Sequence, residues 1–198
     1  MIQRLTTPLI DCARRLRDRQ VVRLMGLIAI AAVLADWASK SWALERANDA
    51  LVPLGALTLG VVHNQGFALS AGDGEISTLV VAGVRLAGLA GFLFLSHRIA
   101  RLLSPRHAYG VALIVAGGMG NLADLFFRGA VVDFIGAGPL VVDWGSAPLH
   151  MHVVFNVADL FILIGIGMIA PFLHEAGKAG QRRLAAWERR ILRRGVQY

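Results

Sequence analysis

Two short segments of the chain carry carboxylates beside long apolar runs. Residues 117–134, GGMGNLADLFFRGAVVDF, end on Asp133 between two apolar neighbours. Residues 155–160, FNVADL, repeat the Asn-x-x-Asp spacing of the first segment with Asn156 and Asp159. Polar groups are costly to bury in apolar surroundings, so their presence there indicates a use. We expect Asp133 and Asp159 to meet in one site.

Two carboxyl groups in a partly dry site cannot both ionise cheaply. One keeps a proton while the other stays charged, which supplies a general base for water and a general acid for a leaving amine. The apolar neighbours of Asp133 favour a raised pKa, and Asn156 can orient Asp159 by a hydrogen bond. The alternative is that the two carboxylates cap helices or pair with Lys40 and Arg128.

Four apolar runs must position these residues; they cover residues 22–44, 76–96, 108–127 and 153–173. Each run has close to the ~20 residues that a helix needs to cross the hydrocarbon core of a bilayer. The chain has 198 residues, of which 56% are hydrophobic and 17% charged, which argues against an ordinary soluble domain. We expect an all-α membrane protein, with residues 1–198 forming one integral membrane domain that ends in a basic cytoplasmic tail at 174–198. The first run has no convincing cleavage site and is expected to remain as a span.

The positive charges of the chain, which carries a net charge of +7, follow a membrane topology. Lysines and arginines gather before the first run, between the second and third, and after the fourth. Residues 45–75 hold only Arg46, and residues 128–152 hold only Arg128. By the positive-inside rule, both termini and the middle loop of a multi-pass membrane protein are cytoplasmic, and residues 45–75 and 128–152 face outward. Membrane lipid, and not nucleic acid, is the expected surrounding partner.

The first outer segment, residues 45–75, contains β-type pieces such as 57–63, which glycines and a proline interrupt. It predicts a small sheet, or cradle, at the outer membrane surface. At the other end of the chain, residues 181–194 form a basic helix with an apolar side. This helix is expected to lie on anionic lipid, or alternatively to bind a partner.

On this topology, separate parts of the chain deliver polar groups to one level, near the outer membrane surface. A single site there is the simplest account. The spacing of four between Asp36 and Lys40 favours an ion pair within one helix. The polar groups at this level are Asp36, Lys40, Asn64, Asn121, Asp124, Asp133, Asn156 and Asp159.

Other kinds of site find less support. His150 and His152 could bind a metal with an aspartate, but no HExxH or similar spacing is present. The single cysteine, Cys12, lies in the cytoplasmic segment of the predicted topology, so a Cys–His pair is not expected. The glycines at 117, 118 and 120 favour close helix packing over ligand binding. We expect neither a metal nor a cofactor.

Five sequence blocks, in this order, resemble the signature blocks of lipoprotein signal peptidase (signal peptidase II). They are DWASK at 36–40, NQG at 64–66, GGMGNLAD at 117–124, GAVVDF at 129–134 and FNVAD at 155–159. The resemblance covers about residues 30–165. It implies a four-span aspartyl endopeptidase of the bacterial inner membrane that cuts signal peptides from diacylglyceryl-modified prolipoproteins, just before the lipid-carrying cysteine. By it, Asp133 and Asp159 match the catalytic pair, and the matching supporting residues are Asn64, Gly66, Asn121, Asp124 and Asn156.

The chain departs from this pattern at Leu125, where the family normally has an arginine after the aspartate. Arg128, three residues later, is the nearest arginine and could take over a contact to Asp124 or to substrate carbonyls. The departure leaves an alternative function open, a non-catalytic paralogue that binds a lipidated or membrane partner as an assembly factor. Arg85, in the second run, is either functional or a snorkelling side chain without a role.

Overall fold

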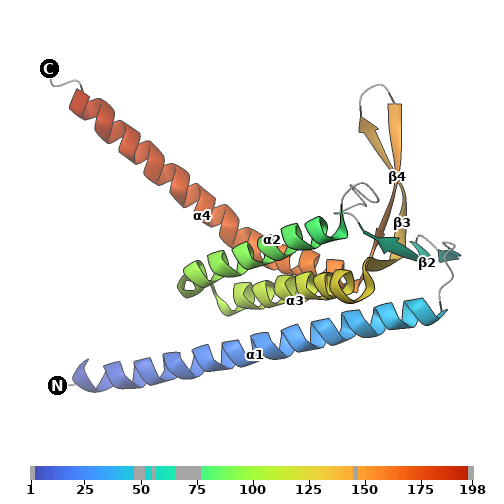
Figure 1. Ribbon diagram of the computed structural model, residues 1–198. Helices are drawn as coiled ribbons and strands as arrows, with labels where there is room; N and C mark the ends of the chain where they lie inside the picture. The colour runs from blue at the N-terminus through green and yellow to red at the C-terminus, as the bar shows by residue number, and fades with distance from the viewer. Residues whose placement is uncertain (1–2, 47–51, 55–56, 66–76, 145–146, 196–198) are drawn as a thin grey trace.

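The computed structural model describes residues 3–46, 52–54, 57–65, 77–144 and 147–195. The structure contains four long helices and two pairs of strands; one pair follows the first helix and the other precedes the last helix (Figure 1). The helices are α1 (Gln3–Arg46), α2 (Thr78–Ile99), α3 (Pro105–Arg128) and α4 (Val157–Gly195), and a short 3-10 turn (Ala100–Leu102) follows α2. The strands are β1 (Val52–Leu54), β2 (Leu57–Asn64), β3 (Val131–Trp144) and β4 (Ala147–Phe155).

Four of the described helices are long and apolar enough to cross a membrane, as predicted. The spanning segments are Asp18–Arg46, Thr78–Ile99, Pro105–Arg128 and Val157–Trp187. Two boundaries differ from the prediction. Residues 153–155 belong to strand β4 and not to the fourth span, and the basic stretch at 181–194 continues α4 instead of forming a separate helix.

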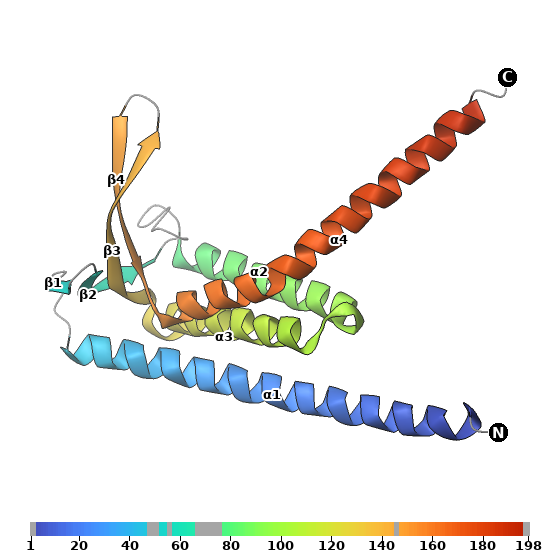
Figure 2. The same cartoon turned by 180° about the vertical axis from the view of Figure 1, so that it is seen from behind.

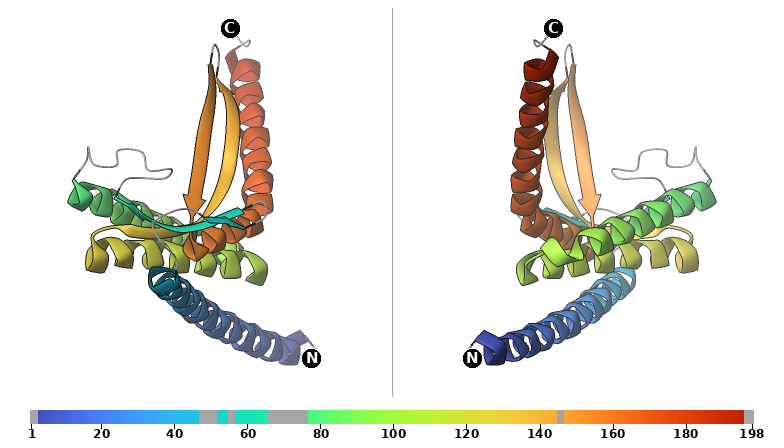
Figure 3. Two further views of the ribbon diagram at one scale, coloured as in Figure 1. Left: turned by 90° about the vertical axis from the view of Figure 1, so that its right-hand side faces the viewer. Right: turned by 90° about the vertical axis from the view of Figure 1, so that its left-hand side faces the viewer.

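The strands form one antiparallel sheet in the order β1-β2-β3-β4 at one end of the helices (Figures 1 and 2). Strand β2 confirms the β-type pieces expected at residues 57–63. The long hairpin of β3 and β4 was not predicted. It projects away from α1, α2 and α3 (Figure 3), whereas the start of α1 and the end of α4 lie at the opposite end of the molecule from the sheet (Figure 1).

Helix α3 is the centre of the helical part, because α1, α2 and α4 all contact it. Small residues allow the closest approaches. A Cβ atom added at Gly117 would collide with the backbone oxygen of Ala158 on α4, and one at Gly120 would overlap the carboxylate of Asp36 on α1. The prediction that these glycines serve helix packing is therefore confirmed at both positions.

A left-handed turn carries the chain from α3 into β3. Gly129 follows the last residue of α3 with a φ of 76°, a conformation that side chains with a Cβ rarely adopt. Strand β3 then alternates its faces. Val132 and Phe134 pack in a cluster with Ala43 of α1 and Val61 of β2. Val131, between them and the turn, faces the opposite way and packs against Val81 of α2 and Leu125 of α3.

Candidate active site

A closed ion-pair cluster joins α1 to α3. Lys40, fully buried, places its ammonium 2.8 Å from carboxylate oxygens of Asp36 and Asp124 and 2.9 Å from Oδ1 of Asn121. Its three donor protons thus face three acceptors. Arg128 completes the cluster by donating to the second oxygen of Asp124 at 2.5 Å. Two cations match two anions, so the cluster is neutral as a whole.

The predicted ion pair between Asp36 and Lys40 is present, but it is only one part of this cluster. Asp36 also accepts a hydrogen bond from the backbone N–H of Ala158, at 3.0 Å, and so holds the start of α4 against α1. Arg128 takes the contact to Asp124 that the sequence suggested for it, while its guanidinium lies 5.1 Å from the ring centre of Trp37. Arg128 therefore belongs to the α1–α3 contact.

Asn156 begins α4 with a reciprocal capping arrangement. Its Oδ1 accepts from the backbone N–H of Asp159, and Asp159 accepts in turn from the backbone N–H of Asn156, both at 3.1 Å. The amide nitrogen of Asn156 remains for two further bonds, to Oδ1 of Asn121 at 3.0 Å and to Oδ1 of Asp133 at 2.6 Å. These bonds fix the orientation of the amide in a fully buried side chain.

Asn121 connects the ion-pair cluster to the two carboxylates. Its Oδ1 accepts from Lys40 and from Asn156, which leaves its amide nitrogen to donate to Oδ1 of Asp159 at 2.8 Å. The acceptor and donor ends of this side chain cannot be exchanged without breaking all three bonds. The buried lysine thereby sets which end of Asn121 faces Asp159.

Asp133 lies on β3 with only 4% of its surface exposed. Its two oxygens accept hydrogen bonds from Asn64 of β2, at 3.0 Å, and from Asn156, at 2.6 Å. Burial is the largest cause that raises its pKa from 3.8 to about 6; the hydrogen bond from Asn64 opposes this shift, and the nearby Asp159 adds to it. The apolar neighbours of Asp133 in the sequence predicted this direction of the pKa shift.

Asp159 occupies a different environment from Asp133. It is partly buried and lies in the first turn of α4, where the positive end of the helix dipole favours a negative charge. It accepts from one side-chain amide and one backbone N–H. Burial therefore favours a proton on Asp133, while the helix N-terminus favours charge on Asp159.

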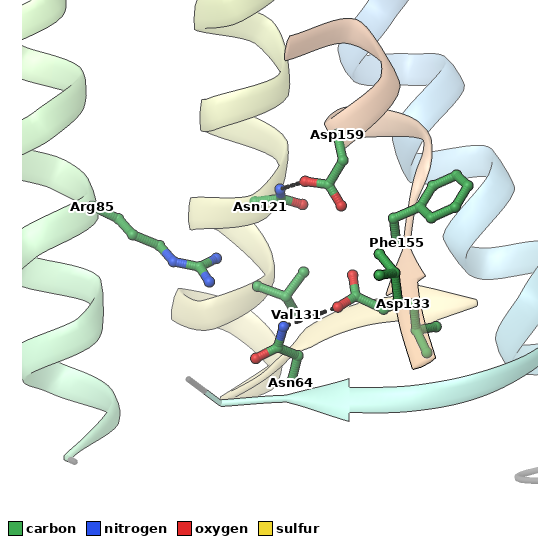
Figure 4. Close-up of a pocket in the computed structure, with 9 residues that line it drawn as sticks. Asn64, Arg85, Asn121, Val131, Asp133, Phe155 and Asp159 are labelled. Atoms are coloured by element: carbon green, nitrogen blue, oxygen red, sulfur yellow. Dashed lines mark hydrogen bonds between the residues drawn. The ribbon is translucent and has the colours of Figure 1, made fainter. Parts of the chain in front are cut away.

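Both carboxylates line one cavity of about 280 Å³, as the sequence predicted for this pair (Figure 4). The cavity opens between α2, α3, α4 and the sheet. Arg85 of α2 points into it from the wall opposite the two carboxylates. The residues that line the cavity are Asn64, Arg85, Asn121, Val131, Asp133, Val153, Val154, Phe155 and Asp159.

Two features of this site were missed in the sequence. One is the pairing of Lys40 with Asp124, which joins two different helices. The other is the position of Arg85 at the cavity. The sequence does hold a signal for this position, because Arg85 lies seven residues after the start of α2 and Asn121 lies seven residues before the end of α3. At ~1.5 Å per residue, both lie ~10 Å from the sheet end of their helices.

The remaining predicted residues divide into two groups. Leu125 is buried against Val81 and Val131 and so fills an apolar contact between α2, α3 and β3. Gly66 lies outside the described residues. The side chains of His150 and His152, the candidate metal ligands of the sequence, also lie outside the described part of the chain.

The arrangement can support hydrolysis. Two carboxyl groups of unequal environment share one cavity, and neutral amides hold both of them in place. A water molecule activated by the charged carboxylate and a leaving group protonated by the neutral one are the chemistry that such a pair supplies.

The chain is similar to one family of known proteins. The family model described as signal peptidase (SPase) II matches residues 28–174. Lipoprotein signal peptidases from Bifidobacterium adolescentis and Caulobacter vibrioides are each 33% identical to the chain, over 81% and 76% of it and 79% and 88% of the relatives. One from Mycobacterium avium is 33% identical over 85% of the chain and 91% of its own length.

The fold also has a solved counterpart. A bacterial membrane enzyme determined by the in meso method at 1.9 Å resolution superposes with a TM-score of 0.60 at 22% identity, over 77% of this chain and 93% of that one. The likeness supports the arrangement of four spans with a small sheet at one end. The family match over residues 28–174 and the relatives that are 33% identical show that the chain belongs to the signal peptidase II family.

Proposed function

We propose that the protein is an intramembrane aspartyl endopeptidase that removes signal peptides from diacylglyceryl-modified prolipoproteins. The observation that carries the proposal is the pair of unequal carboxyl groups, Asp133 and Asp159, in one cavity. The substrate class is supported by relatives that are lipoprotein signal peptidases. The supporting roles of Asn64, Asn121 and Asn156 follow from their hydrogen bonds to the two carboxylates.

In the proposed reaction, charged Asp159 accepts a proton from water as the water oxygen attacks the scissile carbonyl carbon. Protonated Asp133 then gives its proton to the leaving nitrogen as the C–N bond breaks. The products are the carboxyl end of the signal peptide and the free amine of the lipid-carrying cysteine. The raised pKa of Asp133 and the place of Asp159 at a helix N-terminus support this assignment of roles.

We assign residues 1–198 to one integral membrane domain of the bacterial inner membrane, with both termini in the cytoplasm. The distribution of lysine and arginine supports this orientation. It sets the sheet and the cavity at the outer leaflet, where a diacylglyceryl chain anchored in the lipid would hold the scissile bond at the depth of the carboxylates. Surrounding lipid is then a constant partner of the enzyme.

Cleavage of a diacylglyceryl-modified prolipoprotein by the purified protein tests the proposal. Asp133→Asn and Asp159→Asn should each lower the rate by ~10³-fold or more, because each removes one of the two proton-transfer groups. Asp18→Asn, an exposed aspartate at the far end of α1, is the matched control and should cleave like the parent. Thermal unfolding of each variant should show that the fold is retained.

Two results contradict the proposal. Failure of the folded parent to cleave the substrate removes the peptidase activity and turns attention to the binding paralogue. Equal cleavage of the same precursor without its diacylglyceryl group removes the substrate class while leaving the peptidase.

A further inference from the structure

An arginine within a membrane span requires an explanation. Moving a charged side chain to the middle of a spanning helix costs ~2.5–3.5 kcal/mol on insertion scales, so such residues usually face a polar interior. Arg85 is half-buried on α2, and its guanidinium points into the cavity, opposite Asp133 and Asp159 (Figure 4). Both carboxylates attract it electrostatically.

The charges near the cavity can be counted from each element around it. From α1 and α3 come Asp36, Lys40, Asp124 and Arg128, which pair among themselves and sum to zero. On β2, the exposed His63 precedes the inward-facing Asn64 and therefore lies on the other side of the strand. Among the described side chains of β4, which are those of residues 153–155, none is titratable.

Three ionisable groups therefore remain at the cavity among the described residues: Asp133 on β3, Asp159 on α4 and Arg85 on α2. With one carboxyl protonated and the other charged, the guanidinium balances the single negative charge. With both carboxyls protonated, the cavity has an uncompensated positive charge and no base. With both charged, it has a net negative charge and no acid. The neutral state is the one that general acid–base catalysis needs.

We propose that Arg85 is a positioning residue that acts through its charge, favouring loss of the first proton from the Asp133–Asp159 pair and so stabilising the one-proton form against the two-proton form. This inference rests on the proposed peptidase function for its effect on cleavage, although the proton count itself does not need a substrate. Arg85 thereby sets the acid edge of the working pH range. Leu125, which stands where the family normally has an arginine, is buried against Val81 and Val131 and supplies no charge to the cavity.

The test replaces Arg85 with Met, which removes the charge, and with Lys, which keeps it. Arg98→Met, in the last turn of the same helix and away from the cavity, is the matched control. Initial rates on the diacylglyceryl-modified prolipoprotein are measured across pH for kcat and KM. In parallel, infrared titration of the protonated carboxyl stretch, assigned with Asp133→Asn and Asp159→Asn, follows the proton without substrate.

We expect Arg85→Met to move the acid limb of the pH–rate profile upward by about one pH unit, so that the rate below the limb falls about tenfold. KM should stay within about twofold of the parent. The infrared midpoint for the first ionisation should move in the same direction. Arg85→Lys should keep the parent's limb, and Arg98→Met should match the parent throughout.

Other outcomes overturn the inference. If Arg85→Met raises KM but moves neither the acid limb nor the infrared midpoint, the guanidinium serves substrate binding. A parent-like profile in that variant makes Arg85 a bystander. If Arg85→Met does not fold, the test rests on Arg85→Lys. A shifted acid limb in Arg85→Lys would contradict the inference, because this variant keeps the positive charge. Failure of the parent to cleave, with the infrared shift still present, removes the proposed function and leaves the charge role of Arg85.

Discussion

Two polar clusters lie side by side at the sheet end of the helices, and they treat their carboxylates differently. Around Lys40, each carboxylate meets a cation: Asp36 and Asp124 bind the lysine, and Asp124 also binds Arg128. Around the cavity, Asp133 and Asp159 meet neutral amides, and the one cation on the wall, among the described residues, is Arg85. Asn121 is bonded to both clusters.

The difference separates structure from chemistry. Carboxylates paired directly with cations in a buried cluster hold helices together, and such a cluster leaves no room for a reactant. Carboxylates held by amides keep their geometry while their protonation can change. A buried carboxylate is thus a candidate for catalysis when it lines a cavity and accepts hydrogen bonds from amides instead of pairing with a cation. Four predictions test that distinction.

The largest expected effect is on stability, through Lys40. Lys40→Met leaves two buried carboxylates without their shared cation, so the free energy of unfolding should fall by ~3–5 kcal/mol. Denaturation in mixed detergent micelles measures it. Arg128→Gln is the control; that side chain is partly exposed, and its loss should cost only ~1 kcal/mol. Equal stability of Lys40→Met and the parent would remove the structural role of the cluster.

The second prediction concerns pH and Asp133. Because its pKa is raised from 3.8 to about 6 in the folded state, the folded protein binds more protons than the unfolded chain between these values. Stability from this group is fully present below pH 3.8 and is lost as pH rises through 6, by ~3 kcal/mol in total.

Unfolding measured from pH 4 to 8 should therefore show a steeper loss of stability in the parent than in Asp133→Asn. The two curves should run parallel above pH 7. Identical slopes across the whole range would mean that Asp133 ionises as an ordinary aspartate.

The third prediction tests the helix contact that brings the two clusters together. Gly117→Ala places a Cβ against the backbone of Ala158 at the start of α4 and should lower the free energy of unfolding by ~1–3 kcal/mol. Gly88→Ala, with nothing near its added Cβ, should leave stability unchanged or raise it by up to ~1 kcal/mol. Thermal unfolding of both in one detergent measures the contrast; equal effects would show that α3 and α4 can separate at no cost.

The smallest expected effect comes from Asn64. Its hydrogen bond favours the charged form of Asp133, so Asn64→Ala should raise the pKa of Asp133 further. In the proposed mechanism Asp133 must be protonated, and the alkaline limb of the pH–rate profile should therefore move up by ~0.5–1 unit. The acid limb, which is assigned to Arg85, should not move. A joint movement of both limbs would mean that the two carboxyls respond as one unit to either change.

Much of the fold and site could be predicted because the relevant signals are local. Four long apolar runs and the distribution of arginines define the spans, and Asn-x-x-Asp places Asn156 and Asp159 on one helical turn. The same Asn156 is also the signal for the start of α4, through its cap to Asp159. The prediction nevertheless began the span at 153, because a short apolar run before a helix cannot be told from a strand by its periodicity.

The rest depends on pairings between distant segments. The β3–β4 hairpin does have a local signal, because the turn pair Gly145-Ser146 separates two β-type runs in the sequence. Its register, however, is set by partners such as Ile135 and Phe155 across the sheet. Lys40 showed an acidic partner four residues away, which concealed its second partner on α3. The two carboxylates that attract Arg85 lie on β3 and α4, far from it in the sequence.

The alternation of β3 limits how the chain can change length. Val131 and Asp133 line the cavity, whereas Val132 and Phe134 pack against α1 and β2. One residue inserted or deleted between Gly129 and Asp133 would exchange these two sets, pointing the carboxyl group into the apolar cluster and a valine into the cavity. Homologous chains should therefore tolerate insertions in the β3–β4 hairpin far from the helices, while the count of residues between α3 and Asp133 stays constant.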